Sequence, residues 1–231
     1  MRTMMLLAAL SVMVGCSSRL PTEQEQAESL IERKQDLVEV EYIEDATGLQ
    51  WVSPELKSSY YRQLQIEPVG LNQKAKADHQ LPSFVLERVS ARLTDILKQE
   101  LSNGVPIVES PSGRTAVLRV EITRASTDFE DLKITEVLPY GALIGGAKAL
   151  LGTRDRNVRI LVESQLSDSL SGELLAERVS VLLAKDVLEN DTVQLEYEQI
   201  KETVERFTQD IVHFIRMTAY TAKLNEQSEE G

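Results

Sequence analysis

The feature that most constrains the fold is a long strand pattern in the last third of the chain. Apolar side chains occupy Val158, Ile160, Val162 and Leu166, which places them on one face of a strand. The Asp-Ser-Leu-Ser-Gly connection at 168–172 has the residue types of a hairpin turn. Because a second run of strand-forming residues follows over 173–185, the sequence predicts a long antiparallel hairpin.

Other segments indicate that this hairpin belongs to a larger sheet. Leu118, Val120 and Ile122 alternate with polar or charged residues, a pattern typical of a strand with one buried face. Pro68 lacks an amide donor, so the strand that contains it ends there or lies at an edge. The additional strands are predicted over residues 63–69, 105–109 and 115–124.

Two helices are predicted beside this sheet. Residues 81–101 have apolar positions at helical spacing, with Pro82 in the first turn and Gly104 after the last. Residues 193–223 carry a single apolar stripe and would form a helix about 45 Å long. We expect this helix either to pack along its own sheet or to extend past it and meet a partner. The fold class is therefore α+β, with an antiparallel or mixed sheet and helices packed on one face.

The start of the chain has the layout of a secretory signal. Arg2 is followed by an apolar run over 4–14, which is too short to span a bilayer, and then by Gly15 and Cys16. This end resembles the bacterial lipobox, in which the cysteine becomes the acylated first residue. An ordinary cleaved signal and a cytoplasmic protein are the alternatives. In bacterial lipoprotein sorting, a serine rather than an aspartate after the cysteine favours the outer membrane, and Ser17 stands there.

The predicted domain organisation follows from these features. We expect a lipoprotein signal peptide over 1–15, an acylated flexible tether over 16–45, a single α+β domain over 46–223 and an acidic tail over 224–231. A short helix is expected within the tether, around 24–40. Trp51, near the start of the domain, either covers one end of the core or stacks on a ligand.

Charge and motifs exclude several classes of function. The chain has 25 basic and 37 acidic residues, and its net charge of −12 disfavours nucleic-acid binding. Cys16 is the only cysteine, so no intrachain disulfide forms, and the two histidines, His79 and His213, have no partner ligands at a characteristic spacing. A Gly-x-Ser-x-Gly motif is also missing from the sequence. We therefore predict no catalytic residues, no metal and no cofactor.

A glycine-rich apolar segment over 138–152 is the candidate interaction surface. Its lysine does not directly follow the second glycine, so it is not a phosphate-binding loop. A small-residue helix buried under the sheet and a surface that docks against a partner or lipid are the two interpretations. The residues proposed for docking are Gly141, Leu143, Ile144, Gly145, Gly146, Leu150 and Leu151.

A series of short motifs resembles the bacterial lipoproteins grouped as domain of unknown function 3313. The resemblance covers roughly residues 45 to 185 and leaves the final helix outside. It implies an envelope lipoprotein of Gram-negative bacteria and carries over no catalytic residue. The motifs, in chain order, lie at 48–54, 66–69, 118–123, 137–139, 145–152, 163–168 and 172–176.

Three functions are compatible with these observations. The first is a noncatalytic binding or assembly module, anchored in the outer membrane through its lipid, facing the periplasm and contacting an envelope protein. The second is a periplasmic carrier of lipid or another small apolar ligand, with a pocket between sheet and helices. The third is a hydrolase with an unrecognised site, which would need a cleft of convergent polar groups. No oligomeric state is indicated.

Overall fold

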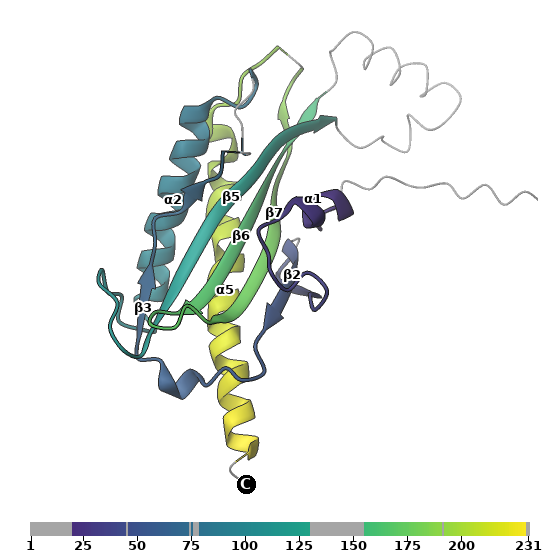
Figure 1. Cartoon of the computed structure of the whole chain (residues 1–231). Helices are drawn as coiled ribbons and strands as arrows, with labels where there is room; N and C mark the ends of the chain where they lie inside the picture. The colour runs from purple at the N-terminus through teal and green to yellow at the C-terminus, as the bar shows by residue number, and fades with distance from the viewer. Residues whose placement is uncertain are drawn as a thin grey trace, which may run out of the picture.

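The computed structural model describes residues 20–44, 46–73, 75, 79–129, 155–190 and 192–229. Within these residues, seven strands form one mixed sheet, and two long helices cover one of its faces (Figure 1). The predicted α+β class is confirmed. The strand order is β1-β2-β7-β6-β5-β3, with β4 beside β5: β1 (Val38–Ile43), β2 (Ala46–Val52), β3 (Gln63–Ile66), β4 (Gly70–Leu71), β5 (Thr115–Phe129), β6 (Arg156–Asp168) and β7 (Leu174–Leu188).

The β6–β7 hairpin, which the sequence predicts, lies at the centre of the sheet. Strands β6 and β7 pair antiparallel, with Val162 opposite Ser180. In the turn, the Asp168 carboxylate accepts hydrogen bonds from the amides of Leu170 and Ser171. Gly172 adopts a positive φ of 72°, which glycine tolerates better than other residues. The residue types at 168–172 therefore supply the geometry of the turn.

Helix α2 (Ser83–Leu101) connects the parallel part of the sheet. Strands β3 and β4 run parallel to β5, and a parallel pair needs a crossover connection. Residues 105–109 form a single bridge between Leu64 and Ile107, whereas the sequence predicted a strand there. The Pro106 carbonyl accepts a hydrogen bond from the Leu64 amide, which helps to form this bridge. Because Pro106 has no amide to donate, the pairing does not extend into a strand.

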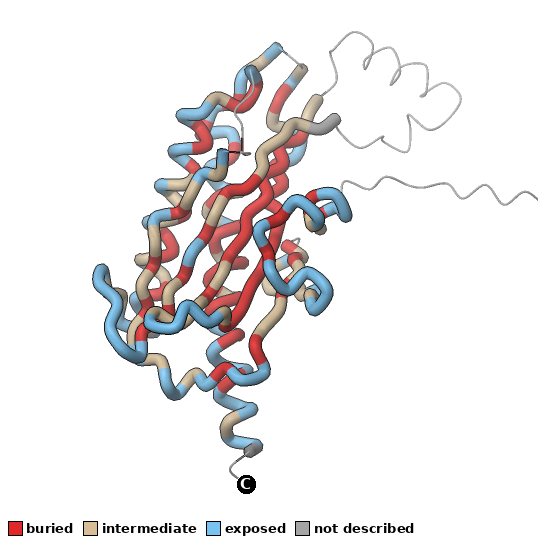
Figure 2. Tube along the Cα trace, viewed as in Figure 1, coloured by how far each residue is buried: buried red, intermediate tan, exposed pale blue. Residues whose placement is uncertain are grey.

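The main core lies between the sheet and its two long helices, α2 and α5 (Tyr197–Glu229) (Figure 2). The apolar stripe predicted for the last helix is buried at Ile200, Val204, Ile211 and Phe214. Helix α5 has 33 residues, so it is about 50 Å long. It continues through most of the segment predicted as an acidic tail.

The opposite face of the sheet is partly covered by residues 20–37, which we call the strap. The strap contains α1 (Glu23–Glu28), and β1 follows it directly and pairs antiparallel with β2. The described domain therefore begins well before residue 46, and residues 20–44 of the predicted tether are part of it. The short helix expected around 24–40 is limited to the six residues of α1. A 3-10 turn, η1 (Ser58–Tyr60), joins β2 to β3.

Candidate functional site

A buried ion pair fixes the start of the strap on β6. Glu25 accepts hydrogen bonds from Arg159 Nε at 2.9 Å and from Arg159 Nη2 at 2.8 Å. Arg159 Nη2 also donates to the Leu20 carbonyl at 2.8 Å. Burial raises the pKa of Glu25, but hydrogen bonds from Arg159 and the Thr22 amide outweigh this effect and hold the pKa below its usual range. The carboxylate is therefore ionised at neutral pH and its charge is compensated.

Two buried carboxylates hold the rest of the strap through its main chain. Glu163 Oε2 accepts from the Leu30 amide at 2.7 Å, while Thr123 Oγ1 donates to Glu163 Oε1 at 2.8 Å. Glu177 accepts from the amides of Glu32 and Arg33 at 2.9–3.1 Å. Burial raises the pKa of Glu163 above its ordinary value. These contacts bind backbone amides, so the strap needs no strong sequence pattern of its own.

Apolar contacts accompany the polar ones on this face. A second buried cluster, separate from the main core, joins Ile31 of the strap to side chains of β6 and β7. Arg33 of the strap also lies over the Trp51 ring, 4.9 Å from its centroid. Trp51 is thus half-buried beneath the strap. The members of the cluster are Ile31, Leu161, Val179, Val181 and Leu183.

The C-terminal half of α5 presents a second feature, an apolar ridge that faces solvent. Met217, Tyr220 and Leu224 are spaced by three and four residues, which places them on one face of the helix. They are 40%, 56% and 46% exposed, respectively. We call these three residues the α5 ridge. Large apolar side chains grouped on one exposed helix face are typical of an interaction surface.

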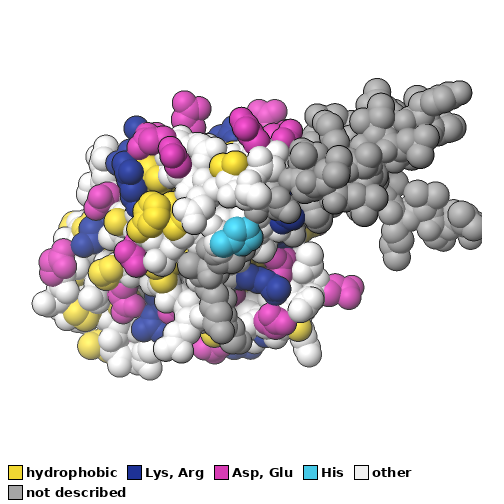
Figure 3. Space-filling view, turned by 90° about the horizontal axis from the view of Figure 1, so that it is seen from above, with side chains coloured by type: hydrophobic (Ala, Val, Ile, Leu, Met, Phe, Trp, Pro, Cys, Tyr) yellow, Lys and Arg dark blue, Asp and Glu magenta, His cyan; other side chains and the backbone are white. Residues whose placement is uncertain are grey.

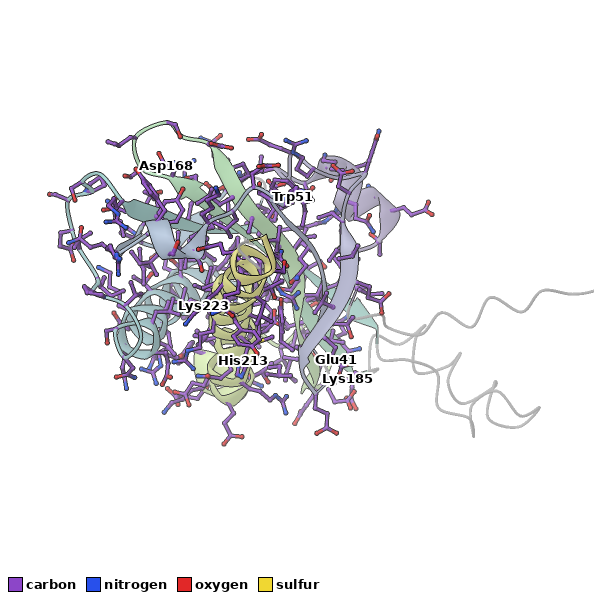
Figure 4. All side chains as sticks on the ribbon, turned by 90° about the horizontal axis from the view of Figure 1, so that it is seen from below. Glu41, Trp51, Asp168, Lys185, His213 and Lys223 are labelled. Atoms are coloured by element: carbon purple, nitrogen blue, oxygen red, sulfur yellow. The ribbon has the colours of Figure 1, made fainter. Side chains whose placement is uncertain are left out.

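A hollow lies on each side of this ridge. The first, about 310 Å³, is lined by Val38, Tyr42 and Met217, among others. The second, about 360 Å³, is lined mainly by apolar groups and includes Leu64, Tyr220 and Lys223. In Figure 4, Lys223 and His213 lie along α5, whereas Trp51 lies on the strap side of the sheet. The ridge and its hollows could hold an apolar side chain or a small apolar molecule.

A fully buried ion pair fixes α5 against the sheet. Arg178 of β7 donates to both carboxylate oxygens of Asp210, at 2.8 and 2.6 Å, and both side chains are 0% exposed. The guanidinium also donates to Gln50 and lies 4.7 Å from the centroid of the Tyr42 ring. Burial raises the pKa of Asp210, and Arg178 opposes that shift. This pair sets the position of the helix that carries the ridge.

The residues predicted as sites fall largely outside the described part of the chain. Cys16 and the signal residues 1–15 lie outside it, and so does the candidate surface at Gly141, Leu143, Ile144, Gly145, Gly146, Leu150 and Leu151. The flanking residues of that surface are placed, because Phe129 at the end of β5 pairs with Arg156 at the start of β6.

The described residues hold no group of three or more His, Cys, Asp or Glu side chains able to bind a metal. His213 is half-buried, with Nδ1 2.7 Å from the Gln209 carbonyl. Across the described ranges, no helix is long and apolar enough to cross a membrane.

Sequence reasoning did not find the buried charges or the ridge. Glu163 directly follows the apolar run 160–162, and Arg178 directly precedes Val179 in a buried strand; charges in such positions signal buried partners. The spacing of Met217, Tyr220 and Leu224 also stands in the sequence, on a face different from the stripe that was used to predict the helix. Glu25 completes a Thr-x-x-Glu capping box at the start of α1, which signals a helix start but not the ion pair with Arg159.

Comparison with known proteins places the chain in a family. The family described as a protein of unknown function, DUF3313, matches residues 26–211. The chain belongs to this family. The predicted membership is confirmed, and the DUF3313 match extends beyond residues 45 to 185 to include most of the strap and the first part of α5. Part of the final helix is therefore within the family region.

Relatives of this DUF3313 protein are themselves lipoproteins. It is 24% identical over 208 residues to the uncharacterized lipoprotein YdcL of Escherichia coli K12, covering 90% of this chain and 93% of YdcL. This similarity supports the lipoprotein class that the sequence before Cys16 predicts.

Among solved structures, hypothetical protein CT253 of Chlamydia trachomatis is 10% identical, with a TM-score of 0.39 over 70% of this chain and 96% of that one. Lipoprotein GNA1162 of Neisseria meningitidis is 11% identical, with a TM-score of 0.32 over 67% of this chain and 97% of that one.

Proposed function

We propose that this protein is anchored in the outer membrane through acylated Cys16, faces the periplasm, and acts there as a noncatalytic binding or assembly module. Acylation is supported by the signal layout before Cys16 and by the relationship to a lipoprotein. Each buried methylene contributes about 0.8 kcal/mol to membrane binding, so two or more acyl chains anchor a protein stably. The anchor then needs no membrane-binding surface on the domain to stay attached.

Replacing the acylated residue tests the anchor. We expect Cys16→Ser to move the protein from the membrane fraction to the soluble periplasmic fraction. Fractionation and mass spectrometry of the N-terminal peptide measure this directly. Tight membrane association of Cys16→Ser would contradict acylation as the anchor. Recovery of the parent protein in the inner-membrane fraction would contradict the outer-membrane location.

The observation that carries the binding role is the α5 ridge. Met217, Tyr220 and Leu224 expose large apolar side chains on one face of a helix fixed to the sheet by a buried ion pair. A rigid apolar helix face fits a groove on a protein partner, in the way amphipathic helices are commonly recognised. The partner expected is an envelope protein with an apolar groove.

In-cell photo-crosslinking from Tyr220 tests this role. We expect one defined envelope protein to be captured, and we expect the adduct to disappear when Met217 and Leu224 are both replaced by Asp. Phe84, an aromatic side chain of α2 that is 63% exposed, provides the matched control position. Equal capture from both positions, or capture that survives the double replacement, would refute the ridge as a binding surface.

The glycine-rich segment remains a second proposed contact of the same module. We expect crosslinks from residues 141–151 to an envelope protein, and loss of those crosslinks when Gly145 and Gly146 are both replaced by Asp. If the double replacement instead unfolds the domain by circular dichroism, the segment is part of the core.

A carrier of small apolar ligands is the second candidate function, favoured by the 360 Å³ apolar hollow beside α5. Under this proposal, protein purified from the envelope carries a co-purifying lipid or fatty acid. Ala219→Phe, which fills the hollow, would abolish that ligand while leaving the melting temperature close to the parent value. Mass spectrometry of an organic extract distinguishes the two functions.

A further inference from the structure

The strap brings the proposed lipid anchor close to one end of the sheet. Leu20, the first described residue, is bound through its carbonyl to Arg159. Four chain steps separate Cys16 from Leu20, and an extended chain spans at most about 3.6 Å per residue, or about 14 Å in all. An acyl chain on Cys16 would therefore hold Leu20 within about 14 Å of the bilayer surface.

Arg159 lies near the end of the sheet at which β5 ends and β6 begins. Its register partner is Ser126 of β5, three positions before the pairing of Phe129 with Arg156. We call this the anchor end. Asp168 is nine positions after Arg159, so the hairpin turn lies about 30 Å farther along β6. The anchor end and the hairpin end thus differ greatly in their distance from Leu20.

The contacts that hold the strap are strong enough to keep this arrangement. The Arg159 and Glu25 side chains are 8% and 7% exposed, and breaking such a buried pair leaves an uncompensated charge away from water. Glu163 and Glu177 bind the following main chain, and Ile31 packs into the second cluster. Together these contacts turn the segment after Leu20 into a fixed attachment.

We propose that the anchor end of the domain lies against the phospholipid surface, and that the strap fixes this orientation. The inference rests on the proposed acylation of Cys16. Viewed from above, the described residues of this end carry acidic and basic side chains side by side, with apolar ones between them (Figure 3). Such a mixed surface gives no strong attraction to or repulsion from anionic headgroups, so the short attachment sets the orientation.

The orientation also places the α5 ridge away from the membrane. The C-terminal part of α5 lies at the hairpin end, where Glu226 accepts a hydrogen bond from the Ser59 amide and Tyr61 donates one to Asp168. In Figure 1 the C-terminus lies beyond this end of the sheet. The ridge is then presented to the periplasm.

Energy transfer from two positions to the bilayer tests the orientation. The full-length acylated protein is reconstituted in vesicles of phosphatidylethanolamine and phosphatidylglycerol that contain a headgroup-labelled acceptor. Donor dyes are attached through Ala27→Cys, on α1, or Leu170→Cys, in the hairpin turn; Cys16 is blocked by its lipid. We expect transfer from position 27 to exceed transfer from position 170 several-fold.

Variants of the ion pair test the role of the strap. We expect Arg159→Gln, or Glu25→Gln if the first does not fold by circular dichroism, to bring the ratio of the two transfers toward one. Arg119→Gln, which removes an exposed ion pair with Glu67, is the matched control and keeps the parent ratio. A ratio that is unchanged in the folded strap variant would overturn the role of the strap.

Equal transfer from both positions in acylated, vesicle-bound parent protein would overturn the orientation and leave the proposed function standing. An unmodified Cys16, together with no binding to vesicles, would overturn both. Mass spectrometry of the N-terminal peptide separates these two results.

Discussion

At the scale of single residues, Arg178 shows how the sequence accommodates a charge inside the domain. Its guanidinium is fully buried and is matched by Asp210, Gln50 and the Tyr42 ring. Gly48 of β2 makes room for it, since a Cβ at that position would lie 2.7 Å from the Arg178 guanidinium carbon. The glycine in the 48–54 motif therefore has a packing role.

Removing one partner of this pair leaves an uncompensated buried charge. We expect Arg178→Met alone to destabilise the domain by about 3–5 kcal/mol. The double variant Arg178→Met/Asp210→Leu should recover most of this loss, because both charges are then gone. Arg88→Gln, which removes an exposed pair with Glu198, should cost at most about 1 kcal/mol. Urea unfolding measures all three, and a double variant no more stable than Arg178→Met would contradict the explanation.

Glu163 has a testable pH dependence. Burial raises its pKa in the folded protein above the ordinary value of 4.5, so the folded state binds the proton more tightly than the unfolded state does. This residue therefore lowers the free energy of unfolding as the pH rises from about 4.5 through the folded pKa. We expect Glu163→Gln to remove that decrease, as measured by urea unfolding across this range. An unchanged pH slope in the variant would contradict the assignment.

At the scale of elements, the strap is the part that sequence patterns did not predict. The hairpin, β3, β5 and both long helices follow from apolar periodicity, because their side chains face a core. The strap is held instead through main-chain amides of Leu30, Glu32 and Arg33, and any residue except proline supplies such a donor. Its binding site lies more than 130 positions away, on Glu163 and Glu177.

Deleting residues 20–37 should expose the second apolar cluster. The uncovered side chains of Leu161, Val179, Val181 and Leu183 would form an apolar patch on the sheet, and we expect the protein to self-associate. Sedimentation velocity measures this, with deletion of residues 224–231 as the control that leaves the sheet covered. A monomeric strap deletion would show that the strap is not needed to shield this face.

At the scale of the whole molecule, the two edges of the sheet limit pairing with another chain in different ways. Edge strand β1 exposes Glu39 and Glu41 and has a register irregularity between Glu41 and Ile43, both of which hinder pairing with another chain. On the other side the edge is short, because β3 has only four residues. We therefore expect this charge patterning to hinder association between copies of the domain, a role that overall net charge could not reveal.

Removing the charges on β1 tests this edge. We expect Glu39→Val/Glu41→Val to form soluble oligomers or aggregates at concentrations where the parent stays unassociated, as followed by light scattering. Glu87→Val, on the exposed face of α2, is the matched change elsewhere on the surface. If it aggregates equally, the loss of charge alone explains the result.

The separation in sequence between the strap and its site also has a consequence in time. Glu25 lies 134 residues before Arg159, so the strap is synthesised long before the strand that binds it. At about 5–20 residues per second, roughly 7–27 s pass between the two. During that interval the segment next to the proposed anchor has no native surface to bind. Signal-processing and lipid-attaching enzymes that act in that interval would therefore meet Cys16 next to a strap that is still unfolded.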